Sequence, residues 1–136
     1  MDDIDKALED WKRRVDEKTK SIVSQFDKGI VKAAFFAEGK AKENAMNEIY
    51  NTPVPTTKSG KPKWKRTGLY KASIGSGINP DKEHSGILFN SVPYAKHLEF
   101  GTSRGIKGKY ILTNAITKNV ADIKNIIKQH IREVTK

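Results

Sequence analysis

The first fifty residues contain no proline and repeat apolar or small side chains about every 3.7 residues, which keeps one face of an α-helix apolar. The residues on that face are Ile4, Leu8, Trp11, Val15, Ile22, Phe26, Ile30, Ala33, Ala37, Ala41, Ala45 and Ile49. The pattern ends at Asn51-Thr52-Pro53, because the residue before a proline is pushed out of the α region. A helix over 1–51 is too long to bury itself in so small a protein. We therefore expect part of it to lie across a sheet and part to meet a neighbouring subunit.

The remaining residues predict a loop, a small sheet and a second helix. Prolines and Ser59-Gly60 break residues 52–68 into a long basic loop. Strand-like patterns at 69–78 and 86–92 flank a turn at Asn79-Pro80-Asp81, and 103–109 forms another loop. Helical spacing returns over 113–136, with a start at Asn114 or Tyr110.

These elements predict one domain over residues 1–136, of the α+β class. In this arrangement the long N-terminal helix and the C-terminal helix pack on a small antiparallel β-sheet. The strands and their connecting loops occupy residues 69–112.

The formal net charge of +10 is concentrated in the middle of the chain. Residues 1–50 carry ten Lys or Arg against eleven Asp or Glu, whereas residues 51–117 carry eleven against three. Clustered positive charge predicts an anionic partner, either nucleic acid or the acidic face of another protein. The absence of cysteine excludes disulfides, thiol catalysis and Cys-based zinc sites. No apolar run approaches the roughly 20 residues that span a bilayer, so we expect no membrane contact.

Residues 58–66 form the most basic segment, with five cations, no acid and one aromatic side chain. The candidate contact residues are Lys61, Lys63, Trp64, Lys65 and Arg66. Cations on phosphates and a base stacked on Trp64 would suit a nucleic acid. The alternative is that Trp64 packs against the body or an adjacent subunit. We favour protein contact, because nothing in the chain matches a nucleic-acid-binding fold signature.

His97 and Glu99 come closest to a catalytic pair. On a helix they would point about 200° apart, and on a strand they would share a face, but no serine nucleophile or third group accompanies them. His84 lies in a predicted turn and His130 on the last helix, so the three histidines do not form a metal site. We therefore expect no enzymatic activity, no metal and no cofactor. Gly75-Ser76-Gly77 lacks phosphate-loop spacing and predicts a strand bulge or bend.

Three short motifs occur in an order that resembles a phage family. The first joins Pro53-Val54-Pro55 with Thr67-Gly68-Leu69 and Ser73-Ile74. The second joins Pro93-Tyr94-Ala95 with Leu98-Glu99-Phe100-Gly101-Thr102, and the third joins Tyr110-Ile111-Leu112 with Ala115. In this order the chain resembles the head–tail connector or tail-completion (neck) proteins of long-tailed phages, the family typified by the tenth gene product of a lambdoid coliphage. Two departures are the basic insertion Thr56–Arg66 and Lys109-Tyr110-Ile111-Leu112, which replaces the usual Pro-Phe-Leu.

The resemblance implies a non-enzymatic structural virion protein of the phage neck. It would form an oligomeric ring, a hexamer or dodecamer, that joins the head to the tail or completes the tail tube. Its partners would be its own copies and neighbouring neck, head-completion or tail-tube proteins, with passive contact to phage DNA. It would be made and assembled in the host cytoplasm and reside in the virion. The alternative is a small basic nucleic-acid-binding protein, and a hydrolase would need His97, Glu99 and His84.

The second motif predicts a rigid corner for assembly. Pro93 fixes its own φ, and Gly101 permits a backbone angle that is closed to other residues. Glu99 is nearly alone in a basic region, where Arg66, Arg104 or a lysine of a neighbouring subunit would pair with it. Aromatic anchors complete the corner. Outside the basic loop, the predicted interface comprises Tyr94, His97, Glu99, Phe100, Arg104 and Lys107.

Overall fold

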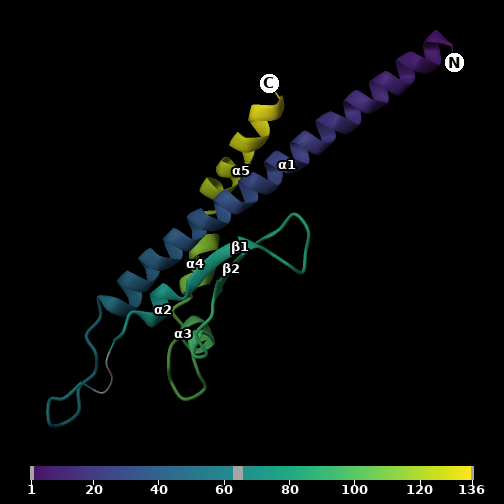
Figure 1. Ribbon diagram of the computed structural model, residues 1–136. Coiled ribbons are helices and arrows are strands. Elements are labelled where there is room, and N and C mark those ends of the chain that lie inside the picture. The colour runs from purple at the N-terminus through teal and green to yellow at the C-terminus, as the bar shows by residue number, and fades with distance from the viewer. Residues whose placement is uncertain (1, 63–65, 136) are drawn as a thin grey trace.

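One helix, α1 (Asp3–Ala45), forms the axis on which the other elements pack (Figure 1). The computed structural model describes residues 2–62 and 66–135. The side chain of Asp2 caps the helix by accepting a hydrogen bond from the backbone N–H of Asp5 at 2.8 Å. At its other end α1 continues as a π-helical turn, η1 (Met46–Tyr50), and the helical path ends at Asn51, two residues before Pro53. The predicted extent of the first helix is therefore confirmed.

Small residues let the rest of the chain approach α1 closely. The buried residues of the helix are Gly29, Ala33, Ala37, Ala41 and Ala45, spaced four apart on one face. A Cβ placed on Gly29 would lie 3.1 Å from the Cα of Ile127, so the second long helix nearly touches the α1 backbone there. Gly29 thus marks a close helix–helix crossing.

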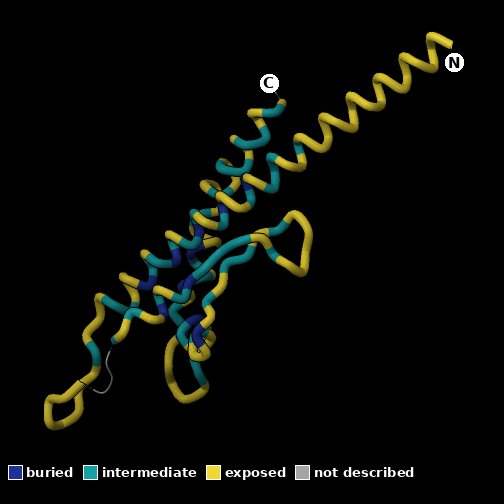
Figure 2. Tube along the Cα trace, viewed as in Figure 1, coloured by how far each residue is buried: buried dark blue, intermediate teal, exposed yellow. Residues whose placement is uncertain are grey.

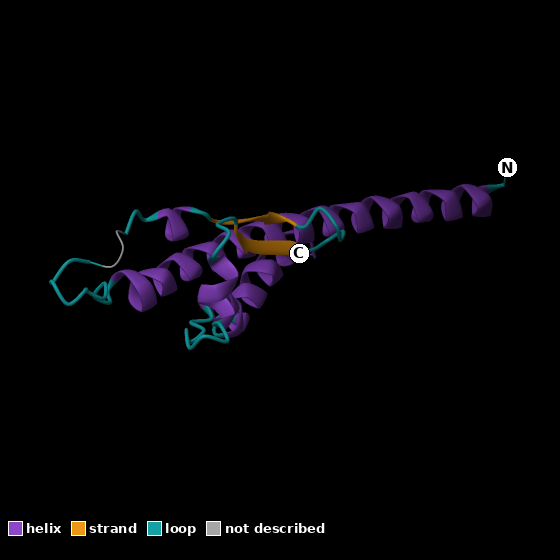
Figure 3. Cartoon of the chain, turned by 90° about the horizontal axis from the view of Figure 1, so that it is seen from below, coloured by secondary structure: helices purple, strands orange, loops and turns teal. Residues whose placement is uncertain are grey.

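Two strands, β1 (Ile74–Ile78) and β2 (Gly86–Asn90), form an antiparallel hairpin that lies against α1 (Figure 3). Their register is regular, with Ile74 opposite Asn90 and Ile78 opposite Gly86. The predicted bulge at Gly75-Ser76-Gly77 is therefore wrong. Gly75 is needed for a different reason, because a Cβ there would lie 2.6 Å from the ring of Phe89 across the hairpin.

The predicted first strand begins too early. Residues Leu69–Ala72 form a single helical turn, α2, because Gly68 has a φ of +79° and turns the chain before it. The second strand also ends earlier than predicted, at Asn90. The Asn90 side chain donates to the carbonyl of Tyr70 at 2.8 Å and accepts from the N–H of Val92 at 3.0 Å, which turns the chain out of the sheet.

Two helices occupy the region predicted as one helix over 113–136, and a third, short helix lies before them in the segment predicted to hold strands and connecting loops. A short helix, α3 (Ala95–Phe100), precedes α4 (Ile111–Thr117) and α5 (Val120–Thr135). The helical path is interrupted between α4 and α5 at Asn119, whose side-chain amide donates a hydrogen bond to the carbonyl of Ala115 at 2.9 Å. Helix α5 runs back along α1 in the opposite direction (Figure 1).

The hydrophobic core lies where the C-terminal part of α1 meets the hairpin, α2 and α4. It contains Ala41, Ala45, Tyr70, Ile74, Val92, Ile111 and Ala115. Ile111 is completely buried, so the third sequence motif serves the core. Two long helices with a two-stranded antiparallel sheet make the protein α+β, as predicted.

Candidate assembly surface

Two of the three sequence motifs meet around one open groove at the end of α1 that carries the long loops. The groove has a volume of about 510 Å³. The first motif supplies its lining through Pro53, Pro55 and 67–69, and the second through Tyr94 and Leu98. The remaining lining residues are Ile49, Tyr50, Thr52, Arg66, Tyr70 and Lys109. The lining is largely apolar and its charged members, Arg66 and Lys109, are both cationic.

Arg66 closes the loop over 52–66. Its guanidinium donates to the carbonyls of Tyr50 and Thr52 and to the hydroxyl of Thr52. Tyr50 is the last residue of the long helical path and Thr52 begins the loop, so the Arg66 side chain joins both ends of the loop. Arg66 was predicted to contact a partner, but it is half-buried and its guanidinium is used within the chain, while its buried Nε has no hydrogen-bond partner among residues 2–62 and 66–135.

The tip of this loop forms a small hairpin of its own. Thr56 pairs with Pro62, and the N–H of Thr57 donates to the carbonyl of Lys61 at 2.8 Å. Lys58 and Lys61 are exposed at the tip. The other predicted contact residues of the segment, Lys63, Trp64 and Lys65, lie outside the described residues.

Glu99 is buried, with 5% of its surface exposed, and its carboxylate is satisfied inside the chain. The backbone N–H groups of Leu112 and Thr113 each donate to it at 2.8 Å, and the Thr113 hydroxyl donates as well. The carboxylate therefore caps the N-terminus of α4, where a negative charge is favourable. The predicted ion pair of Glu99 with Arg66 or Arg104 is not formed within the described parts of the chain.

Tyr70 lies beside this carboxylate and under the groove. Its hydroxyl is buried and has no hydrogen-bond partner in the part of the chain that the structure describes. Burial, with a further contribution from the charge of Glu99, raises the pKa of Tyr70 to about 12. Its ring stacks on Tyr94, with 6.5 Å between the ring centroids, so the exposed Tyr94 rests on a buried aromatic base.

Helix α3 presents the other predicted corner residues to solvent. His97 and Phe100 are exposed, whereas Glu99 points into the core. His97 and Glu99 thus point to different environments, as expected for two helical residues two positions apart. Phe100 makes an edge-to-face contact with Tyr110, with 6.3 Å between the ring centroids, and is 66% exposed.

A tight loop follows α3 and carries two predicted cations. Gly101 has a φ of +82°, and a Cβ there would lie 2.5 Å from the carbonyl oxygen of Ile106. The predicted need for glycine at this position is confirmed. Gly101 pairs with Lys107, and Arg104 and Lys107 are exposed on the loop. This loop and the one over 52–66 both lie at the end of the molecule remote from the N-terminus (Figure 1).

The other histidines are distant from the groove. His84, in the β1–β2 turn, has its Nδ1 2.7 Å from a carboxylate oxygen of Asp27 on α1, and that hydrogen bond raises the pKa of His84. His130 lies on α5 with its Nδ1 3.0 Å from the carbonyl of Ile126. The histidines occupy separate regions, and no group of three His, Asp or Glu side chains within 2–62 and 66–135 is arranged to hold a metal ion.

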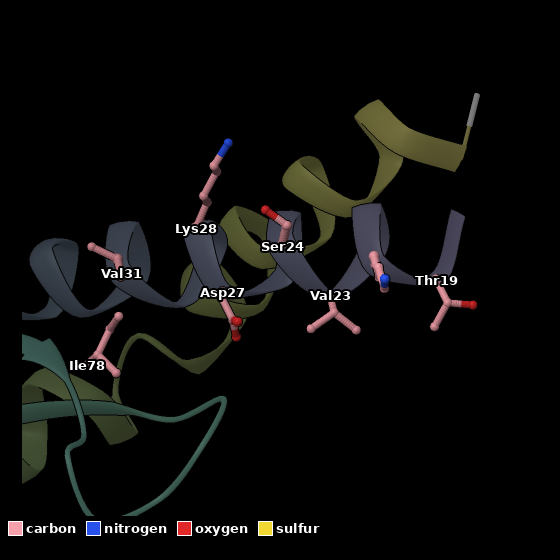
Figure 4. A pocket seen from close by; sticks show the side chains of 8 residues that line it. Thr19, Val23, Ser24, Asp27, Lys28, Val31 and Ile78 are labelled. Carbon is pink, nitrogen blue, oxygen red and sulfur yellow. The ribbon is translucent and has the colours of Figure 1, made fainter. Parts of the chain in front are cut away.

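A second open hollow, of about 660 Å³, lies between the middle of α1 and the hairpin (Figure 4). Its apolar lining comes from Val23, Val31 and Ile78, all exposed, and Asp27 is its acidic member. Thr19 and Val23 extend from the same side of the helix in this view. Asp27 also holds the His84 ring, and the apolar residues around it offer packing surface.

Sequence reasoning missed the groove residues Tyr50, Leu69 and Tyr70. Leu69 is more than half exposed and begins the helical turn α2, whereas the sequence pattern predicted that it begins a strand. A turn formed by Thr67-Gly68 was the available signal, because a glycine with positive φ can reverse the chain and expose the next residue. The tyrosines carried no local signal, since they meet only through tertiary packing.

No protein-family model, curated protein or solved structure matches this chain. Among the described helices, none is long and apolar enough to cross a membrane.

Proposed function

We propose that this protein is a structural subunit of the phage neck, which forms a ring that joins the head to the tail or completes the tail tube. The observation that carries the proposal is the convergence of the first two motifs on one exposed, largely apolar groove. Residues over forty positions apart build this surface, and the motif order is the feature that resembles neck proteins. Apolar surface with a cationic rim suits a protein partner that carries acidic side chains.

The polar groups of the motifs support an assembly role. Glu99 is used to cap α4, and the fork of Arg66 is used to close a loop. Both side chains therefore shape the groove from within. The surface left for a partner consists of apolar and aromatic groups, chiefly Leu69, Tyr94 and Phe100, which are the groups that dominate interface energetics.

The two loops extend the same end of the body. The tip at 56–62 is held by its own hydrogen bonds, and its exposed lysines have no acid in the segment to neutralise them. In a ring, these loops would reach adjacent subunits or the next layer of the neck. A ring requires a heterologous contact, in which two different surfaces of neighbouring subunits meet, and the groove would be one of these surfaces.

Deletion of Thr57–Lys65 tests the proposal. We expect the variant to fold, as measured by circular dichroism and thermal unfolding, and to fail to join heads to tails in an assembly assay. Removal of Lys82 and Glu83 from the exposed β1–β2 turn is the matched control and should leave joining intact. Normal, infectious virions from the loop deletion would overturn the role of the loop.

Direct measurement of assembly provides a second test. The purified protein is mixed with a tail-tube protein and examined by native mass measurement and negative-stain microscopy. Ring particles of six or twelve copies are expected with the partner. Since many such proteins remain monomeric until they meet a partner, the decisive failure is the absence of any ring or bound partner in the mixture.

Nucleic-acid binding is the second candidate function, and the observation that favours it is the net charge of +8 over residues 51–117, from eleven cations and three acids. Binding of duplex or single-stranded nucleic acid would weaken linearly with salt on a log–log scale. Changing Lys58 and Lys61 to serine should then reduce that slope. If the variant with both serines still joins heads to tails, the role of the loop in joining depends on protein contact and not on nucleic-acid binding.

A further inference from the structure

The N-terminal part of α1, residues 3–20, extends beyond the rest of the protein as an uncovered arm (Figure 2). All of these residues are exposed. Four large apolar side chains lie in one row along the arm and are exposed by 71%, 58%, 60% and 42%: Ile4, Leu8, Trp11 and Val15. A row of this kind on a soluble protein indicates an interaction surface.

The row continues a face that α5 covers farther along. Gly29 packs against Ile127 and His130, and the end of α5 reaches α1 near Ser21 and Gln25, where Glu133 and Val134 are neighbours. Toward its N-terminus α1 keeps the same apolar face, and none of the other described helices lies beside it there (Figure 2). The exposed row is thus an extension of an existing helix–helix contact, left without a second helix.

The spacing of the row matches a coiled-coil seam. Steps of four, three and four residues from Ile4 to Val15 place the side chains alternately at the two core positions of a heptad. A helix with the same spacing would interlock with it over about 24 Å, the length of 16 residues. The arm itself supplies such a helix in a second copy of the chain.

Charge determines the direction of that pairing. Residues 2–10 carry five acids and one lysine, a net charge of −4, whereas residues 12–20 carry five cations and two acids, a net charge of +3. A parallel pair would place like charges side by side, and an antiparallel pair places the acidic half of each arm against the basic half of the other. Asp5 and Lys12 flank the seam, each one residue after a core side chain.

We propose that the arms of two copies pair in antiparallel orientation, with Ile4 opposite the partner's Val15 and Leu8 opposite the partner's Trp11. This register fills every layer with apolar side chains and places Asp5 beside the partner's Lys12. It also ends each arm opposite residue 17 of the other, before α5 begins to cover α1 near Ser21. The contact has two-fold symmetry, so it is separate from the heterologous contact between neighbouring subunits of the proposed ring.

An arm seated in the groove of a second copy fits less well. The acidic first turns would suit the cationic rim formed by Arg66 and Lys109. However, Lys12 and Arg14 flank the same row of apolar side chains and would be brought toward that rim and the basic loops. The antiparallel pair sets the acidic half of each arm, with a net charge of −4, against the basic half of the other, with a net charge of +3.

Cysteine cross-linking tests both register and direction, because the natural chain has no cysteine. A tagged Ile4→Cys variant is mixed with an untagged Val15→Cys variant under mild oxidation. We expect the mixed disulfide to dominate over either homodimer. Dominant Ile4→Cys homodimers would indicate parallel pairing and overturn the proposal, as would the absence of any cross-link. Cross-linking of Leu8→Cys to Leu69→Cys would show that the arm occupies the groove of a second copy, and this result would also overturn the proposal.

Sedimentation of the purified protein tests the energetics. The wild type should associate to dimers at high micromolar concentration, and Leu8→Asp with Trp11→Asp should abolish this. Phe35→Asp is the control, because Phe35 is 68% exposed on α1 but outside the arm. Asp5→Lys should weaken association at least tenfold, and adding Lys12→Asp should restore it. A monomeric wild type, or no rescue by the double swap, would overturn the proposal, whereas loop deletion and ring formation test the neck function independently.

Discussion

Thr113 donates two hydrogen bonds to the carboxylate of Glu99, one from its backbone N–H and one from its hydroxyl. The Leu112 N–H donates to the other carboxylate oxygen at 2.8 Å. A residue of α3 therefore caps the first turn of α4 and couples the two helices. The sequence motif suggested that Glu99 forms an ion pair between subunits. Because Glu99 is buried, its role is instead to stabilise the fold of its own chain.

Replacement of Glu99 by alanine should destabilise the protein by about 2–4 kcal/mol, because it leaves the capped N–H groups unsatisfied and removes packed atoms. Glu99→Gln retains one acceptor oxygen and should cost less. Glu43→Ala, at an exposed position on α1, is the control and should change stability by less than about 0.5 kcal/mol. Urea denaturation measures all three. An unchanged midpoint for Glu99→Ala would contradict the capping role.

The contrast with Glu99 explains which features the sequence could predict. The helix over 3–50 follows from local spacing and from Pro53, so its extent was predictable. The cap of Glu99 on Thr113 spans 14 positions and depends on how α3 meets α4, so no local pattern contained it. Leu69–Ala72 was assigned to a strand because four residues are too few for a helical period to be detected.

Two glycines of the 101–110 loop separate backbone strain from steric overlap. Gly101 and Gly105 both have positive φ, but only at Gly101 would a Cβ overlap other atoms, 2.5 Å from the Ile106 oxygen. Gly105→Ala should therefore cost about 1–2 kcal/mol from conformation alone. Gly101→Ala should cost clearly more and should shift the backbone signals of residues 106–108. Equal losses of thermal stability in the two variants would show that the steric overlap at position 101 is relieved without cost.

The contact of His84 with Asp27 predicts a pH dependence. Hydrogen bonding to the carboxylate raises the folded-state pKa of His84 above its ordinary value of 6.5. The stabilisation is therefore fully present below that ordinary value and is lost as pH rises through the raised value. Asp27→Asn should return the pKa of His84 toward its ordinary value of 6.5. NMR titration of the His84 ring protons measures this pKa in the wild type and in the variant, and an unchanged pKa would exclude the pair in solution.

Arg66 predicts the local stability of the long loop. Its guanidinium holds the carbonyls of Tyr50 and Thr52, and hydrogen bonds from a charged group contribute about 1.5–3 kcal/mol. In Arg66→Ala, the amides of Asn51 and Thr52 should exchange roughly tenfold faster or more, because the end of η1 opens more often. Arg66→Lys keeps the charge without the fork and should recover little protection. The amide of Thr57 is an internal reference, because the loop tip closes through its own bond to Lys61 and should exchange at the wild-type rate. Equal acceleration along the whole loop would mean that Arg66 stabilises the fold globally, and no acceleration would mean that other contacts hold the loop.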